Sequence, residues 1–310
     1  MTAPAIDVVH VGSASRDLTG DDPRGWRLGG GASYSALTTA RLGLRTAAVI
    51  GVDSDAAVAS ELDLLRDAGV ELLLVGLDEG PVFLNRETAG GRVQTCLAPG
   101  RSLPIPRLPA SWCEAPAWSL VPVAGELGDT WASVVPAGAY LGLGWQGLLR
   151  ELVPDREVRR RPPAPSALLS RADLVGVSRH DLEPDSGLAG LTRLLRPGAE
   201  LVVTDGAAGG HLRRLGEDGR ARIRRYRAVT PDREADPTGA GDVFLAALLA
   251  SAVWPELAGR GEGRRPHPDL RFAASAASFV VEAPGLHGVP DRAAVLARLT
   301  RGWPSRSSSG

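Results

Sequence analysis

Short apolar runs rich in β-branched residues alternate along the chain with longer stretches of helical periodicity. The runs that we expect to be strands are Ile6–Val11, Thr46–Ile50, Trp118–Val123, Ala139–Leu143, Asp173–Val177 and Leu201–Thr204. The stretches that we expect to be helices are Ser33–Leu42, Ala56–Ala68, Gln146–Leu152, Gly187–Leu195, Val243–Ala252, Asp269–Glu282 and Asp291–Arg301. This alternation is typical of an α/β protein with a mainly parallel sheet. Such sheets bind ligands beyond the carboxyl ends of their strands.

Two segments interrupt the alternation. Residues 13–28 are polar and rich in turn formers, and residues 70–106 contain the strand-like runs VELLLVGL, VFLNRE and RVQTCLA, with a turn at Ala89-Gly90-Gly91. A hairpin that belongs to no βα unit predicts either a small sheet that stands off the main one as a lid, or an ordinary edge hairpin. We expect one domain over residues 1–300, with lid strands at about 12–30 and 70–106, and a disordered tail over residues 301–310.

Composition removes several kinds of chemistry. The 310 residues include no lysine, so all 35 basic side chains are arginine, against 36 acidic ones. Schiff bases, pyridoxal phosphate attachment and the lysine of a Walker A loop are therefore excluded. The two cysteines, Cys96 and Cys113, are too few for a disulfide framework and lack metal-ligand spacing.

Charge and hydropathy indicate no macromolecular partner. The net charge is −1, and the arginine-rich stretches Arg156–Pro165 and Arg220–Arg227 come without aromatic platforms, which favours solvated faces over a nucleic-acid site. Met1–His10 has no basic segment of the kind that begins a signal peptide. The longest apolar run, Val243–Trp254, is shorter than a membrane span. We expect a cytoplasmic protein that binds neither nucleic acid nor membrane.

The segment Gly142-Leu143-Gly144-Trp145-Gln146-Gly147 follows a predicted strand and matches the GxGxxG fingerprint of dinucleotide sites. The acidic residue expected about twenty positions later is missing, and the bulky Trp145 lies inside the turn. A plain strand-to-helix turn is therefore favoured, and a dinucleotide-dependent oxidoreductase remains an alternative.

The segment Asp236-Pro237-Thr238-Gly239-Ala240-Gly241-Asp242 precedes an apolar helix. Small residues there leave backbone N–H groups free, and the helix dipole favours an anion at this end. A carboxylate beside an anion site costs electrostatic energy, so we expect it to have a function. Phosphoryl transfer would give it one. The N–H groups would hold charge on the phosphate, and Asp242 would take the proton of the attacking hydroxyl. The alternative is that Asp242 only caps the helix.

The DPTGAGD segment and its helix resemble the C-terminal signature of the ribokinase-like (PfkB) carbohydrate kinases. Residues 29–43, GGGASYSALTTARLG, resemble the N-terminal signature, and residues 203–209, VTDGAAG, resemble the strand and glycine turn beside the nucleotide. The hairpin with Gly91-Arg92 resembles the lid strands of that family. The resemblance covers nearly the whole chain and implies a three-layer α/β sandwich with a mainly parallel central sheet and a small β lid.

The resemblance also implies roles at matching positions. Asp242 would be the catalytic base, and the anion hole would consist of the amides of Gly239, Ala240 and Gly241. The residues implied to bind the substrate are Asp17, Gly30, Gly31 and Tyr34. The residues implied to flank ATP are Thr204, Gly206, Gly209 and Thr238.

Two departures from the family pattern concern specificity and metal binding. Tyr34 stands where the family usually has Asn, and Ser178-Arg179-His180-Asp181 stands where the family has an Asn-x-x-Glu motif tied to magnesium and phosphate. We expect Asp181 to contact a metal through water; the alternative is that it only caps the turn before Leu182. The Tyr34 pattern argues against ribokinase or fructokinase specificity and looks most like a divergent branch that includes inositol- and nucleoside-type kinases.

The implied function is an ATP-dependent phosphotransferase that phosphorylates a hydroxyl of a small sugar, polyol or nucleoside. Phosphoryl transfer needs a divalent cation, so Mg²⁺ is implied with ATP, and the resemblance allows a monovalent cation near Asp236. The alternative is a catalytically retired nucleotide- or sugar-binding protein of the same fold. The exposed edges of the hairpin favour a homodimer through the lid.

Overall fold

The structure, a computed structural model, describes residues 5–88, 91–183, 187–216, 220–259 and 267–301. The predicted turn residues 89–90 and the predicted tail beyond residue 301 lie outside this part. Within it, no helix has the length and apolarity needed to cross a membrane.

A nine-stranded sheet runs through the described chain in the order β16-β15-β14-β13-β9-β8-β1-β4-β5. Its strands are β1 (Val8–Ser13), β4 (Thr46–Val52), β5 (Glu71–Gly76), β8 (Ala117–Leu120), β9 (Tyr140–Gly144), β13 (Leu174–Ser178), β14 (Glu200–Thr204), β15 (Gly210–Leu215) and β16 (Ala221–Tyr226). Neighbours pair in parallel except β14 with β15 and β15 with β16. The expected mainly parallel sheet is confirmed, and each of the six predicted strand runs overlaps one of these strands.

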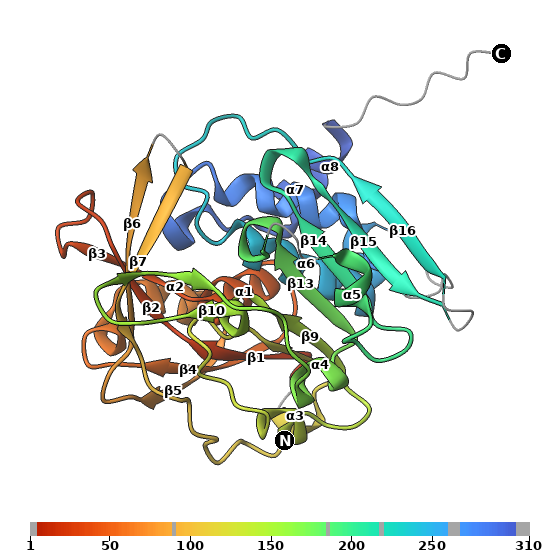
Figure 1. The fold of residues 1–310 in the computed structure, drawn as a ribbon. Coiled ribbons are helices and arrows are strands. Elements are labelled where there is room, and N and C mark those ends of the chain that lie inside the picture. Colours follow the sequence, from red (N-terminus) through yellow and green to blue (C-terminus); the bar gives the residue numbers. More distant parts are fainter. Residues whose placement is uncertain (1–4, 89–90, 184–186, 217–219, 260–266, 302–310) are drawn as a thin grey trace.

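Helices cover both faces of this sheet (Figure 1). One face packs against α1 (Gly31–Arg41), α2 (Glu61–Asp67), α6 (Ala240–Val253), α7 (Leu270–Val280) and α8 (Arg292–Arg301). The other face packs against α3 (Trp131–Val134), α4 (Ala167–Arg171) and α5 (Leu188–Thr192). Side chains alternate along each strand, so Val8 of β1 joins the first core while Val9 and Val11 join the second. The result is a three-layer sandwich.

A second, five-stranded sheet, which we name the lid sheet, has the order β11-β7-β6-β2-β3. Its strands are β2 (Ser15–Leu18), β3 (Trp26–Gly29), β6 (Pro81–Thr88), β7 (Gly91–Pro99) and β11 (Arg156–Glu157). Because β2 begins two residues after the carboxyl end of β1, the lid sheet starts at the edge where α/β proteins bind ligands. Figure 1 shows β6 and β7 projecting away from the main sheet.

The structure corrects three sequence-based expectations. The run 71–76 lies within the range expected for the lid strands, but it forms β5 of the main sheet, because it follows α2 and completes a βαβ unit with β4. The predicted helix Gln146–Leu152 is instead the 3₁₀ turn η3 (Gln146–Leu149) followed by β10 (Arg150–Glu151). The predicted loop 156–165 begins with β11, which pairs with β7, and β12 (Arg159–Arg160), which pairs with β10. This segment turns at residues 154–155, and β11 joins it to β7 of the lid sheet.

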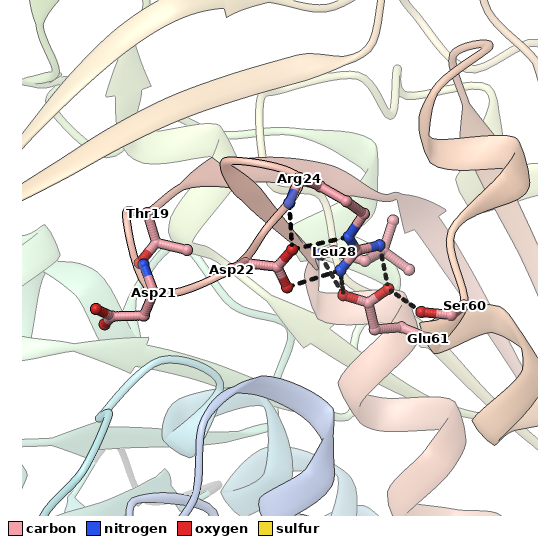
Figure 2. Close-up of polar contacts among 7 residues, drawn as sticks. All are labelled: Thr19, Asp21, Asp22, Arg24, Leu28, Ser60 and Glu61. Atoms are coloured by element: carbon pink, nitrogen blue, oxygen red, sulfur yellow. Dashed lines mark hydrogen bonds and ion pairs between the residues drawn. The ribbon is translucent and has the colours of Figure 1, made fainter.

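The turn between β2 and β3 is bonded to the start of α2 (Figure 2). Arg24 donates to both carboxylate oxygens of Glu61, at 2.6 and 2.8 Å, and also binds Asp22. Glu61 accepts a third hydrogen bond from the backbone N–H of Leu28 in β3, at 3.0 Å. Burial alone would raise the pKa of Glu61, but these hydrogen bonds hold it below its ordinary value. The β2–β3 half of the lid sheet is therefore fixed to the main body.

Replacing Glu61 with alanine should destabilise the protein by about 1–3 kcal/mol, because the Arg24 guanidinium and the Leu28 N–H lose a shared, buried acceptor. Urea unfolding measures the change. The matched control is Asp63→Ala on the same helix, whose carboxylate is 67% exposed and forms an ion pair with the exposed Arg66. That variant should lose less than about 0.5 kcal/mol; equal losses in both variants would contradict the anchor.

Candidate functional site

The N-termini of α1 and α6 meet beside the carboxyl ends of β1 and β8. Gly239 is the N-cap of α6 and has a left-handed backbone, with φ of 83°, and Asp242 is the third residue of the helix. The alternative that Asp242 only caps this helix is therefore wrong, since the cap is Gly239. Asp242 lies in the first turn, where the helix dipole favours a negative charge.

The amides that the resemblance implies as an anion hole lie at the start of α6. The first N–H groups of an α-helix have no partner within the helix, and they carry the positive end of its dipole. The amides implied to form the anion hole are those of Gly239, Ala240 and Gly241 at this end of α6, and the N–H of Ala240 donates to the carbonyl of Pro237 at 3.3 Å. The buried ring of Tyr34 packs directly on Gly239, where any side chain would overlap it. Glycine is thus required at this position.

Glycines of α1 bring that helix against Asp242. A Cβ on Gly31 would lie 2.8 Å from Oδ1 of Asp242 and 3.0 Å from Cβ of Val121. Gly30 has φ of 97°, and a side chain on it would overlap the carbonyl of Ser13. Both residues therefore permit a backbone approach that other residues would prevent.

Asp17 of β2 completes this group from the lid side. Its carboxylate lies against Gly29, and its charge raises the pKa of both Tyr34 and Asp242. The structure thus brings together four of the residues implied to bind substrate, which are Asp17, Gly30, Gly31 and Tyr34, with Asp242.

Asp242 has a pKa raised from 3.8 to about 7. Desolvation by the surrounding protein is the main cause. Arg150 opposes the shift, while the negative charges of Asp181 and Asp17 add to it. A carboxyl group with this pKa is poised to gain or lose a proton near neutral pH.

Asp181 belongs to the 3₁₀ turn η4 (Arg179–Asp181), which Ser178 caps by accepting the N–H of His180 at 3.2 Å. The alternative that Asp181 is only a cap is therefore wrong. Its carboxylate instead accepts hydrogen bonds from Nε2 of Gln146, at 3.3 and 3.4 Å, and lies 3.8 Å from the guanidinium of Arg150.

Arg150 is a site residue that the sequence reasoning missed. Its side chain is only 11% exposed, donates to the carbonyl of Val123 at 3.3 Å, and lies over the ring of Phe83. It is the positive charge that acts on both Asp181 and Asp242. One signal was available, because in a chain without lysine the cation of a phosphate site must be arginine.

The residues implied to flank ATP lie at the same edge of the sheet. Thr204 ends β14 in register with Ser178 at the end of β13. Gly206 is exposed with φ of 49°, whereas Gly209 is buried and its backbone packs on that of Tyr226. Close packing on β16 therefore explains the glycine at position 209. Thr238 donates its N–H to Oδ1 of Asp236 at 2.9 Å, just before the cap of α6.

The GxGxxG segment has a packing role. A Cβ on Gly144 would lie 3.1 Å from the side chain of Val121, and side chains on Gly147 would overlap the carbonyl of Pro122. The segment leads into the 3₁₀ turn η3 rather than into the α-helix that a dinucleotide site needs for its pyrophosphate. The dinucleotide alternative is therefore wrong.

The described residues offer few ligands to a magnesium ion. Among the described residues, no three His, Cys, Asp or Glu side chains gather as a metal site. Mg²⁺ in phosphoryl-transfer sites is commonly held by one or two carboxylates, with phosphates and water as the other ligands. Asp181 fits such an ion as a partial ligand.

No model of a protein family matches the sequence, and no curated protein matches it. Solved structures do match. A pyrophosphate-dependent kinase in the ribokinase family, complexed with a pyrophosphate analog and myo-inositol, is 19% identical with a TM-score of 0.69, over 94% of this chain and 99% of its own.

Two further structures agree. The nucleoside kinase of Methanocaldococcus jannaschii is 17% identical with a TM-score of 0.66, over 96% of this chain and 100% of its own. Ribokinase of Arabidopsis thaliana, complexed with ribose and ATP, is 21% identical with a TM-score of 0.66, over 96% of this chain and 99% of its own. The expected ribokinase-like fold is confirmed for nearly the whole chain.

Replacing Asp242 with asparagine should stabilise the protein at pH 8. A carboxyl group whose folded pKa is raised binds its proton more tightly when folded, so wild-type stability falls as pH rises from about 4 to about 7. The variant lacks this loss and should be more stable by roughly 1–3 kcal/mol at pH 8, with the difference shrinking toward pH 4. Thermal unfolding across this range measures the difference, and a pH-independent difference would contradict the raised pKa.

Proposed function

We propose that this protein is a kinase that transfers the γ-phosphoryl group of ATP to a hydroxyl of a small polyhydroxylated molecule, a sugar, polyol or nucleoside. One observation carries the proposal. A carboxyl group with a pKa of about 7 lies in the first turn of α6, next to amides that can bind an anion and opposite a second carboxylate on the lid sheet. A carboxylate that only caps a helix would not require a raised pKa or a second carboxylate nearby.

The proposed reaction is an in-line transfer. Asp17 accepts hydrogen bonds from acceptor hydroxyls, and the backbone at Gly30 and Gly31 allows the acceptor to lie close to Asp242. Asp242 takes the proton of the attacking hydroxyl as its oxygen bonds to phosphorus and the bond from phosphorus to ADP breaks. The amides of Gly239, Ala240 and Gly241 stabilise charge on the transferred group.

Charge neutralisation is assigned to an arginine and to the metal ion. Arg150 contacts Asp181 and acts on Asp242, which supports its assignment to the donor phosphates. Magnesium, held with the phosphates and by Asp181 through water, would withdraw charge from the leaving group. The residues proposed to flank ATP are Thr204, Gly206, Gly209 and Thr238.

The acceptor class follows from the site and from the compared structures. Tyr34 fills space beside Asp17 and Gly239 with a ring, so the acceptor pocket differs from one lined by a small amide. The compared structures are named for myo-inositol, nucleosides and ribose. A neutral acceptor with several hydroxyls is proposed. The dimer through the lid and the cytoplasmic location stay predictions.

Product formation with a panel of acceptors tests the proposal. Myo-inositol, ribose, fructose, tagatose 6-phosphate, adenosine and cytidine are each offered with Mg²⁺ and either ATP or pyrophosphate, since one compared kinase is pyrophosphate-dependent. We expect ATP-dependent phosphorylation of one acceptor class, and Asp242→Asn should lower kcat by roughly 10²–10⁴-fold while nucleotide binding persists. Turnover with pyrophosphate but not with ATP would show that pyrophosphate, and not ATP, is the phosphoryl donor. ATP binding without turnover on the panel would favour the retired binding protein.

Replacing Arg150 with glutamine should lower kcat by roughly 10²–10³-fold, because charge that develops on the phosphoryl group loses a fixed cation. The matched control is Arg156→Gln, an exposed arginine of β11 in the same connecting segment. Steady-state kinetics should show wild-type kcat for the control. An undiminished kcat in the Arg150 variant would remove this residue from the mechanism.

A further inference from the structure

Arg27 lies on the lid sheet but contacts the segment that leads into α6. In β3 it is directly opposite Asp17 of β2, so the two side chains share one face of the lid sheet. Its NH1 atom lies 3.7 Å from Oδ2 of Asp236, and both side chains are largely buried, with 21% and 22% exposed. A second, weaker contact joins NH2 to the exposed Asp21 at 4.0 Å.

Asp236 connects this arginine to the start of α6. While Oδ2 faces Arg27, Oδ1 accepts the N–H of Thr238 at 2.9 Å, one residue before the Gly239 cap. The carboxylate therefore holds the turn that leads into the anion-binding amides. By holding the Asp236 carboxylate, the charge of Arg27 also holds the turn over residues 236–239.

The aliphatic part of Arg27 passes close to a second turn. A Cβ on Gly285, the first residue of the 3₁₀ turn η7 (Gly285–Gly288), would lie 3.7 Å from Cδ of Arg27 and 3.9 Å from the hydroxyl of Tyr34. Arg27 thus lies between the Asp236 turn and η7. A single side chain from the lid sheet fills the space between these two turns of the main body.

This arrangement does not fit the monovalent cation that the resemblance allowed near Asp236. Both carboxylate oxygens of Asp236 already face a donor, the Arg27 guanidinium at Oδ2 and the Thr238 N–H at Oδ1. A cation beside Asp236 would also lie next to the Arg27 guanidinium, where like charges repel. The residues present provide the positive charge themselves.

We propose that Arg27 takes the place of a monovalent cation at Asp236 and acts as a positioning residue for the start of α6. The lid sheet then supplies a permanent charge that orders the Asp236–Gly239 turn, and the protein is indifferent to the identity of the monovalent cation. The role in turnover rests on the proposed kinase function, whereas the charge replacement itself does not.

The first test needs no turnover. Thermal unfolding of the full chain is followed in KCl, NaCl and tetramethylammonium chloride at equal ionic strength. A protein that binds one of these cations when folded is stabilised by it. We expect the same wild-type midpoint in all three salts. A rise specific to potassium or sodium would overturn the proposal.

A double-mutant cycle tests the contact with Asp236. Arg27→Gln should lower the unfolding midpoint in the wild-type background but much less in the Asp236→Asn background, because the second variant has already removed the partner charge. The matched control is Arg16→Gln on β2, where Arg16 pairs with Asp53 and Asp55 instead. The control should lower the midpoint equally in both backgrounds. Equal losses for Arg27→Gln would overturn the proposal.

Once an acceptor is known, kinetics add a third readout. Wild-type kcat should agree within about twofold across the three salts, and Arg27→Gln should lose at least about tenfold in kcat with little change in the KM of the donor. A wild-type rate that requires potassium, or an unchanged rate in the variant, would overturn the proposal. If the panel shows no turnover, the kinase function fails, and the unfolding measurements still decide the role of Arg27.

Discussion

The close approach of two helix N-termini, those of α1 and α6, is the constraint on which the rest of the site depends. Tyr34 packs on Gly239, and Gly31 faces the carboxylate of Asp242. A side chain on Gly239 would overlap the Tyr34 ring, and one on Gly31 would press on Asp242 and Val121, so this approach depends on both glycines. The approach places the start of α6 and the carboxyl group of Asp242 beside the lid sheet. The two glycine-rich segments of the sequence are far apart in the chain and serve this single junction.

The electrostatics of the junction follow from that geometry. Desolvation raises the pKa of Asp242, and the negative charges of Asp181 and Asp17 add to the rise. Arg150, from β10, and Arg27, from β3 of the lid sheet, supply opposite charge. A fold that gathers carboxylates without such partners would lose stability near neutral pH. The positions of these arginines therefore reduce the loss of stability that the neighbouring carboxylates would cause.

Much of the fold and part of the site could be predicted from the sequence, because they depend on local patterns. Alternating apolar runs gave the mainly parallel sheet, and glycines next to a small-residue helix indicated a close backbone approach. The errors come from non-local contacts. Residues 146–152 have helical periodicity, yet pairing of β10 with β12 keeps part of the segment extended. Arg150 and Arg27 lie in no motif, and their importance appears only when distant carboxylates meet them.

Because the two cations described at the junction are guanidinium groups, the site carries positive charges that do not titrate. A guanidinium stays protonated at any pH that a folded protein survives, whereas a lysine amine in a similar environment can lose its proton. The positive part of the local field is therefore constant across the physiological range. Near neutral pH the charge at the junction changes through Asp242, whose loss of a proton makes the field more negative while both guanidinium charges stay in place.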